Sequence, residues 1–90
     1  MARKRAKKRL RKIDRLLKVY GNCCFWCDDP MEQDTLHNPL SLSVDELLPR
    51  SRGGLRTIDN QVLAHKLCNS QRGVQVASVA AFERHYGMLR

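Results

Sequence analysis

The chain has 90 residues, of which 42% are hydrophobic, and carries a formal net charge of +8 at pH 7. This length fits a single domain with a modest core, so we expect a metal ion or disulfides to stabilise it. No stretch approaches the roughly 20 apolar residues of a membrane span, so a membrane protein is not expected. No apolar run follows the basic N-terminus, so we expect no signal peptide and a cytoplasmic protein whose cysteines bind metal or stay free.

The positive charge lies almost entirely in residues 1–20, which hold ten Lys and Arg against one acid. Residues 21–90 hold seven basic side chains against eight acidic ones. A basic terminal block is typical of an arm that binds nucleic-acid phosphates. The alternatives are a solvated tail and, less favoured because the most basic part lacks large apolar residues, a helix at a membrane surface. The candidate phosphate-binding residues of this arm are Arg3, Lys4, Arg5, Lys7, Lys8, Arg9, Arg11 and Lys12.

Residues 2–19 are predicted to form a helix, because they are good helix formers and include neither Gly nor Pro. An apolar stripe at helical spacing supports this prediction in the second half of the segment, at Leu10, Ile13, Leu17 and Tyr20. We therefore expect a basic helical arm over residues 1–20, followed by a folded domain over residues 21–90.

The domain is predicted to have an α+β fold, with short strands over residues 42–47 and 61–64 and a helix over residues 66–72. A loop with Gly53-Gly54 at its tip separates the strands. Ser78 is predicted to cap a last helix that ends at Gly87 and has Val79, Phe82 and Tyr86 on one face. His85 of this helix is expected at the surface.

Two pairs of metal-ligating residues have the same spacing, Cys24-x-x-Cys27 and His65-x-x-Cys68. Two intervening residues allow one tight turn or one helical turn to direct both side chains at a single ion, and zinc prefers four such ligands. We therefore predict a structural zinc site in which all four positions are filled by the protein. The fourth cysteine, Cys23, is interpreted as a small buried or free thiol, and Trp26 as core cover.

Three further segments are interleaved with these ligand pairs: VDELLPRSRGG at residues 44–54, Asp59-Asn60, and LAHKLCNSQRG at residues 63–73, which includes His65 and Cys68. At this spacing they resemble the motif of HNH (ββα-metal) endonucleases, and especially the small HNH proteins that bacteriophages encode. The resemblance covers roughly residues 20–73. It implies hydrolysis of DNA phosphodiester bonds with one divalent ion, Mg²⁺ or Mn²⁺, and a location in the host cytoplasm if the protein is phage-encoded.

The resemblance also implies a role for individual residues. Asp45 and Asn69 would be the ligands of the catalytic ion, since oxygen ligands suit such hard cations. Asn60 would hold the long loop by hydrogen bonds. Further candidates for phosphate contacts are Arg50, Arg52 and Arg72.

The sequence departs from the family pattern at position 46, where the general-base histidine of the family is replaced by Glu46. Three interpretations remain open. Glu46 could act as a weaker base, since the reference pKa of Glu is about 4.3 against about 6.5 for His. It could join Asp45 at the metal. Or the site could be slow or inactive, and the protein would then be a DNA-binding accessory protein, for example with a partner in phage DNA packaging.

Overall fold

The computed structural model describes residues 2–33 and 37–90, with the side chains of the first helix from residue 11 onward. The elements follow in the order α1 (Ala2–Tyr20), β1 (Leu42–Glu46), β2 (Gln61–His65), α2 (Lys66–Arg72) and α3 (Val79–Leu89). Two short 3-10 turns, η1 (Arg50–Arg52) and η2 (Ile58–Asn60), lie in the loop between the strands. The predicted α+β fold class is therefore confirmed, and each predicted helix and strand is present.

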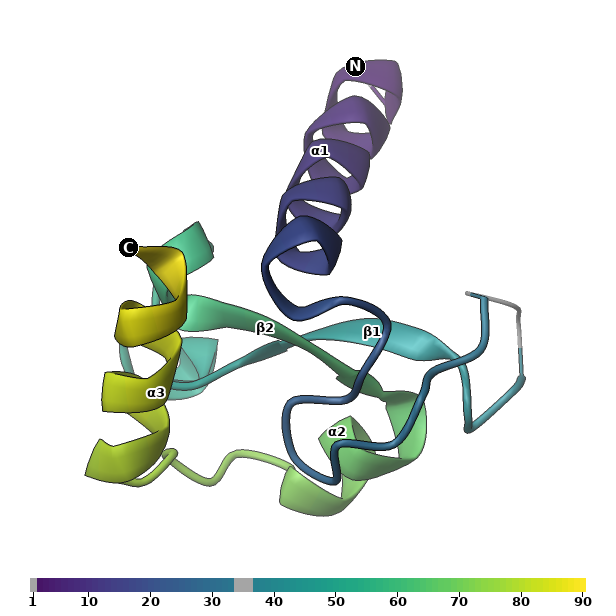
Figure 1. Ribbon diagram of the computed structural model, residues 1–90. Helices are drawn as coiled ribbons and strands as arrows, with labels where there is room; N and C mark the ends of the chain where they lie inside the picture. Colours follow the sequence, from purple (N-terminus) through teal and green to yellow (C-terminus); the bar gives the residue numbers. More distant parts are fainter. Residues whose placement is uncertain (1, 34–36) are drawn as a thin grey trace.

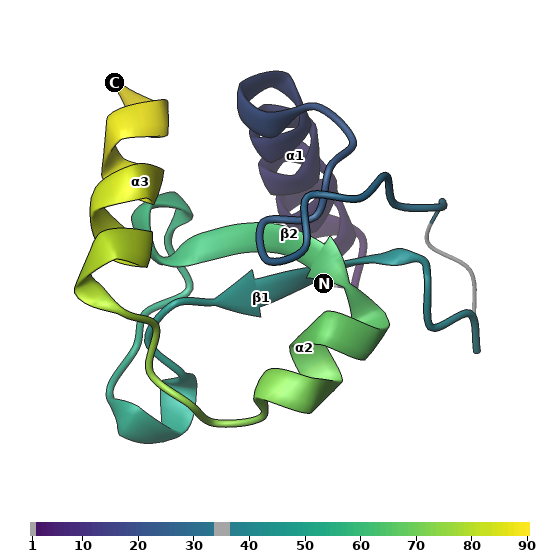
Figure 2. The same cartoon turned by 60° about the horizontal axis from the view of Figure 1, so that its bottom comes forward.

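The two strands form an antiparallel hairpin at the centre of the molecule, and α2 follows β2 directly (Figure 1). Leu42 pairs with His65, and Glu46 pairs with Gln61 at the other end of the ladder. The first backbone N–H groups of α2 are satisfied from outside the helix, because Lys66 donates to the Ser41 carbonyl and Leu67 to the Pro39 carbonyl, both at 2.9 Å. This fixes the direction of α2 relative to the hairpin (Figure 2).

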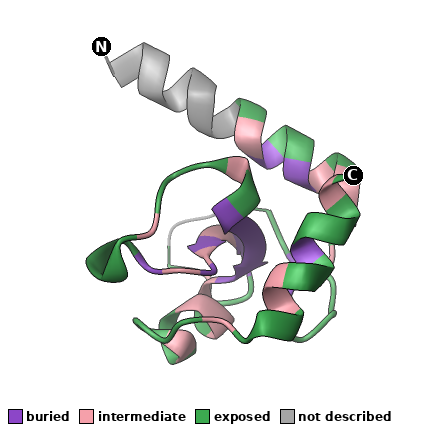
Figure 3. Cartoon of the chain, turned by 90° about the vertical axis from the view of Figure 1, so that its left-hand side faces the viewer, coloured by how far each residue is buried: buried purple, intermediate pink, exposed green. Residues whose placement is uncertain are grey.

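The core lies on both faces of β2, whose five residues are all buried. On one face, Leu63 packs with Leu16 of α1 and Leu42 of β1, and on the other, Val62 packs with Phe25 and Leu47. Buried residues are concentrated where these elements meet (Figure 3). The second half of α1 thus shares a hydrophobic core with the hairpin.

Helix α3 differs from its prediction in the face that it buries. Ser78 caps the helix as predicted, since its hydroxyl accepts from the Ala81 N–H at 3.1 Å, but the helix continues through Gly87 to Leu89. Val79 and Tyr86 are exposed, whereas His85 is completely buried. The prediction that His85 is a surface residue was therefore wrong, because a histidine can enter a core when both ring nitrogens have hydrogen-bond partners.

None of the described helices is both long enough and apolar enough to cross a membrane.

Candidate metal centre and adjoining pocket

The predicted metal ligands converge where the loop after α1 meets the junction of β2 and α2. Their ligand atoms all lie within 4.8 Å of one another, and Sγ of Cys27 and Sγ of Cys68 are 3.3 and 3.8 Å from Nδ1 of His65. Ligand atoms around a tetrahedral zinc ion are about 3.6 Å apart, given bonds of about 2.1 Å to nitrogen and 2.3 Å to sulfur. All four cysteines are free thiols, so this Cys3His cluster can hold a metal ion such as zinc.

The first pair of ligands is presented by a tight backbone turn. Cys24 N–H donates to the Asp29 carbonyl, and Asp28 N–H donates to the Cys24 carbonyl, both at 2.9 Å. Asp28 has a φ of 65°, a left-handed conformation that Asp tolerates better than most residues. Phe25 N–H donates to the Leu63 carbonyl at 2.9 Å and so attaches the turn to β2.

His65 is oriented as a ligand by its second ring nitrogen. Nε2–H donates to the Pro30 carbonyl at 2.9 Å, which leaves Nδ1 facing the thiols. A backbone carbonyl in this position is a common outer partner of metal-binding histidines, because it fixes both the tautomer and the ring orientation. The sequence contains no signal for the role of Pro30, since this contact depends on the folded path of the loop.

The electrostatics of the cluster favour a cation at its centre. Burial tends to raise the pKa of Cys24, but hydrogen bonds from the backbone of Cys27, His65 and Trp26 outweigh it and lower the pKa to about 7. Burial raises the pKa of Cys68 to about 12, and the neighbouring Cys24 adds to the rise. Burial opposes a rise at His65, yet the Pro30 carbonyl and Cys24 raise its pKa. Burial and the neighbouring thiols thus disfavour a second negative charge in the cluster, which a metal cation would offset.

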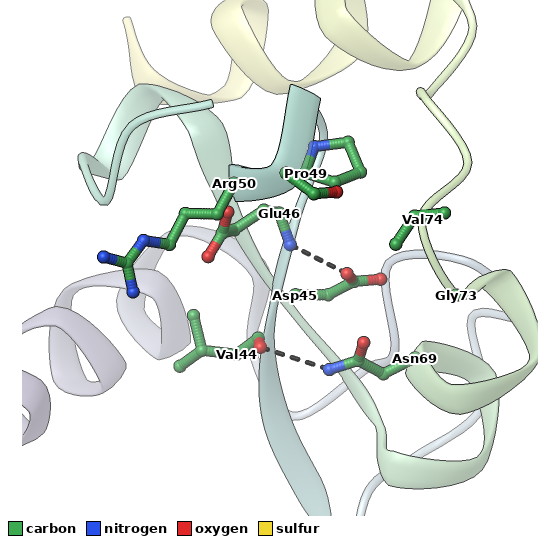
Figure 4. Close-up of a pocket in the computed structure, with 9 residues that line it drawn as sticks. Val44, Asp45, Glu46, Pro49, Arg50, Asn69, Gly73 and Val74 are labelled. Atoms are coloured by element: carbon green, nitrogen blue, oxygen red, sulfur yellow. Dashed lines mark hydrogen bonds between the residues drawn. The ribbon is translucent and has the colours of Figure 1, made fainter. Parts of the chain in front are cut away.

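A pocket of about 250 Å³ lies beside the C-terminal end of β1. Asp45 and Asn69 both line it; Asp45 points to the side of β1 on which α2 lies, and Asn69 points from α2 toward β1 (Figure 4). Glu46 points to the other side, together with Arg50, as the alternation of side chains along a strand requires. The remaining lining residues are Val44, Pro49, Ser51, Gly73 and Val74.

Asp45 is almost completely buried and all its polar contacts are made by neighbouring donors. Oδ1 accepts from the Glu46 N–H at 2.8 Å, while Oδ2 accepts from Trp26 Nε1 at 2.8 Å and from Arg72 Nη1 at 2.7 Å. The Arg72 guanidinium also lies over the Trp26 ring, 3.9 Å from its centroid. Sequence reasoning treated Trp26 as core cover and missed this contact.

Asn69 uses its amide nitrogen to attach α2 to β1. Nδ2 donates to Ser43 Oγ and to the Val44 carbonyl, both at 3.2 Å. Only the amide nitrogen can donate to a carbonyl, so the orientation of this amide is determined, and Oδ1 is turned away from β1. Figure 4 shows that this oxygen lies on the pocket side.

Glu46 has an unusual environment for a carboxylate. Its Oε2 is buried and has no hydrogen-bond partner among the described residues. The same holds for Oε1 of Gln61, the residue that pairs with Glu46 across the ladder. A buried acceptor without a donor is costly, so such an atom is expected to meet water, a cation or a ligand.

Asn60 lies where the sequence placed it, as the residue that holds the loop between the strands. Its Oδ1 accepts from Leu48 N–H at 2.9 Å, and its Nδ2 donates to the Leu48 and Leu55 carbonyls at 2.9 and 2.8 Å. Gly54 lies against the same strand end, and a Cβ at this position would be 1.7 Å from the Leu48 carbonyl oxygen. Only glycine therefore allows the loop to approach β1 this closely.

The basic residues predicted to contact phosphates differ in their exposure and in their hydrogen bonds. Arg50 is exposed and lines the pocket, and exposed Arg52 donates from Nε to the Val74 carbonyl at 2.9 Å. Arg72 is engaged with Asp45 and with the Gln75 carbonyl, so its guanidinium is not free for a phosphate in this arrangement. Arg11 is exposed, and Lys12 donates to the Arg56 carbonyl at 2.5 Å. The side chains of Arg3, Lys4, Arg5, Lys7, Lys8 and Arg9 lie outside the described residues.

A comparison of the sequence with models of known protein families gives no match, and a comparison with curated proteins gives none either.

Proposed function

We propose that this chain is a small zinc-stabilised HNH (ββα-metal) endonuclease that hydrolyses DNA phosphodiester bonds with Mg²⁺ or Mn²⁺. The observation that carries the proposal is the pocket at the end of β1, which Asp45, Glu46, Asn69 and Arg50 all line. Asp45 and Glu46 belong to β1 and Arg50 follows shortly after it, whereas Asn69 belongs to α2, which lies beyond β2 in the sequence. Their chemistry is complementary to a cation and a phosphate, which is the combination that the HNH resemblance implies.

The residues present fit a hard divalent cation. Asn69 Oδ1 is directed away from the hydrogen bonds of its own amide nitrogen, and Asp45 Oδ1 accepts a single N–H in the described residues. Each carbonyl or carboxylate oxygen has two acceptor sites, so both atoms retain capacity for a metal ion. A bound Mg²⁺ or Mn²⁺ would polarise the scissile phosphate and stabilise the leaving oxygen.

Glu46 is proposed to accept the proton of the attacking water. Its side chain lines the pocket from the side of β1 opposite Asp45 and Asn69, and its buried Oε2 has no donor within the described residues. A rotation of this side chain would bring an acceptor without a partner to the attacking water. A carboxylate can act as a general base, although a weaker one than histidine. The second possible role, as a further metal ligand, uses the same free oxygen.

Binding of the duplex is proposed to depend on the basic residues around this pocket and along α1. Arg50 lines the pocket and offers a cation to the scissile strand, while exposed Arg11 and the basic residues that precede it would contact backbone phosphates. Such contacts carry little sequence information, so the arm is expected to bind different sequences with similar affinity.

The test is cleavage of supercoiled plasmid with Mg²⁺ or Mn²⁺. We expect nicked circles with the natural protein, and none with Asp45→Ala or Asn69→Ala. Glu83→Ala provides the matched control, since Glu83 is an exposed acid on α3 outside the pocket. Intact supercoiled plasmid after incubation with correctly folded, zinc-loaded protein would contradict the proposed activity.

A second candidate is a DNA-binding accessory protein without catalysis, for example one that acts with a DNA-packaging partner. The observation that favours it is the ion pair between Arg72 and Asp45, which already neutralises the acid that the catalytic cation needs. A mobility shift with DNA, no nicking in either metal, and co-purification with a large partner would support this candidate over the nuclease.

A further inference from the structure

We infer that Trp26 is a positioning residue for Asp45, an inference that rests on the proposed function because Asp45 is there a ligand of the catalytic cation. The indole Nε1–H donates to Asp45 Oδ2 at 2.8 Å. The same oxygen accepts from Arg72 Nη1 at 2.7 Å, and the guanidinium lies over the indole ring at 3.9 Å. Trp26 therefore touches both the carboxylate and the arginine that pairs with it.

Trp26 connects the Cys3His cluster with the pocket that contains Asp45. Trp26 lies inside the turn from Cys24 to Cys27, so a metal held by the Cys3His cluster would also fix the backbone that carries the indole. Phe25 packs edge-on against Trp26, with ring centroids 4.8 Å apart, and its N–H is bonded to β2. A metal at the Cys3His cluster would thus help to order the indole, and the indole holds Asp45 through its N–H.

The hydrogen bonds leave the carboxylate of Asp45 little rotational freedom. Oδ2 accepts two donors, and Oδ1 is aligned by the Glu46 N–H at 2.8 Å. Removing an outer partner of a metal ligand lowers metal affinity on the order of 10- to 100-fold. Trp26 is neutral, so its replacement changes the orientation of Asp45 without changing the charge near the cation, which replacement of Arg72 would do.

The experiment measures Mn²⁺ binding to the full-length, zinc-loaded protein by calorimetry, without DNA. Trp26→Phe keeps an aromatic face for Arg72 and removes the N–H. We expect Mn²⁺ affinity to fall on the order of 10-fold or more, with the zinc content unchanged. Tyr86→Phe is the matched control, because it removes a polar group from an exposed aromatic residue of α3 and should leave Mn²⁺ affinity unchanged.

A chemically closer variant is available because Trp26 is the only tryptophan in the chain. A synthetic chain with β-(3-benzothienyl)alanine at this position keeps the bicyclic shape and lacks only the N–H donor. It decides the question even if Trp26→Phe loses zinc or fails to fold.

The single tryptophan also provides a spectroscopic signature, since paramagnetic Mn²⁺ bound beside Asp45 should quench its fluorescence, and Asp45→Asn should abolish the quenching.

The outcomes separate this inference from the function on which it rests. If the natural protein binds Mn²⁺ and the benzothiophene variant binds it equally tightly, Trp26 has no positioning role, while the nuclease proposal stands. If the natural protein neither binds Mn²⁺ nor shows quenching, the cation site itself is refuted, and both proposals fall. Weaker binding by the benzothiophene variant, with its zinc retained, supports the positioning role.

Discussion

The Tyr20 hydroxyl and Nδ1 of His85 form a hydrogen bond of 2.5 Å that joins the end of α1 to α3. Nε2–H of His85 donates to the Ile58 carbonyl at 2.6 Å, and burial lowers the pKa of His85, so the neutral ring has Nδ1 as the acceptor of the Tyr20 hydroxyl. Burial raises the pKa of Tyr20 to about 12, partly offset by Arg84, which keeps the hydroxyl protonated as the donor. Three segments of the chain therefore meet at one buried imidazole.

The first prediction concerns acid stability. Burial lowers the pKa of His85, and the Ile58 carbonyl and Asp59 oppose this only in part. The unfolded chain therefore binds this proton more readily than the folded chain. The free energy of unfolding should keep the full contribution of neutral His85 above about pH 6.5, and it should decrease as the pH falls below that value. The measurement is the free energy of unfolding from denaturant titrations between pH 5 and 8. His85→Gln does not titrate, so its stability should depend less on pH over this range; an equal dependence in both proteins would count against this role of His85.

The second prediction concerns the Cys3His cluster. Cys68→Ser should lose zinc and the cooperative thermal transition, because zinc binding at structural sites supplies about 10–16 kcal/mol and a domain is stable by only about 5–15 kcal/mol. Circular dichroism melts and elemental analysis provide the measurements. Cys23→Ser is the matched control, since Cys23 is a free thiol outside the cluster. A Cys68→Ser protein that melts like the natural one would show that the metal contributes little to folding.

The sequence predicted the parts of this fold that depend on local pattern. The cysteine and histidine pairs, the strands and α2 follow from spacing and periodicity, and they occur where expected. The position of Asn60 in the loop followed from the family resemblance. Leu16 was missed as a core residue of α1 although it is completely buried, because the predicted stripe ran along Ile13, Leu17 and Tyr20.

The errors concern contacts between residues that are distant in sequence. His85 was placed at the surface because its polar partners, Tyr20 and Ile58, come from other elements. Trp26 packs against both core clusters, as core cover should, but the sequence does not indicate that it also stacks on Arg72 and shares Oδ2 of Asp45 with it. No periodicity or spacing reports such a contact, since it depends on how α2 crosses the hairpin.

The third prediction concerns the loop between the strands. Asn60→Asp keeps the acceptor for Leu48 N–H but directs a carboxylate oxygen at the Leu48 and Leu55 carbonyls. Replacing two donors with a repelling acceptor in a buried position should cost about 2–4 kcal/mol of unfolding free energy. Chemical denaturation measures the loss. Asp59→Asn is the neighbouring control, because Asp59 is exposed, and its stability should change by less than about 1 kcal/mol.

The last prediction concerns Glu46 and separates its two possible roles. Glu46→Gln preserves the shape of the side chain but cannot accept a proton from water at neutral pH, so nicking should nearly cease. Its thermal stability should stay the same or rise, because the amide replaces a buried carboxylate oxygen that has no donor among the described residues. A function that costs stability in this way is typical of active sites.

Glu46→His completes the test, because histidine is the stronger base at this position. If Glu46 accepts the proton, the histidine variant should nick plasmid faster near neutral pH and acquire an acidic limb near pH 6.5, the reference pKa of His. If Glu46 instead holds the cation, imidazole replaces a hard oxygen ligand, and both Mn²⁺ affinity and nicking should fall. The rate and the Mn²⁺ affinity measured on the same preparation therefore distinguish a base from a ligand, because only loss of a ligand lowers the two together.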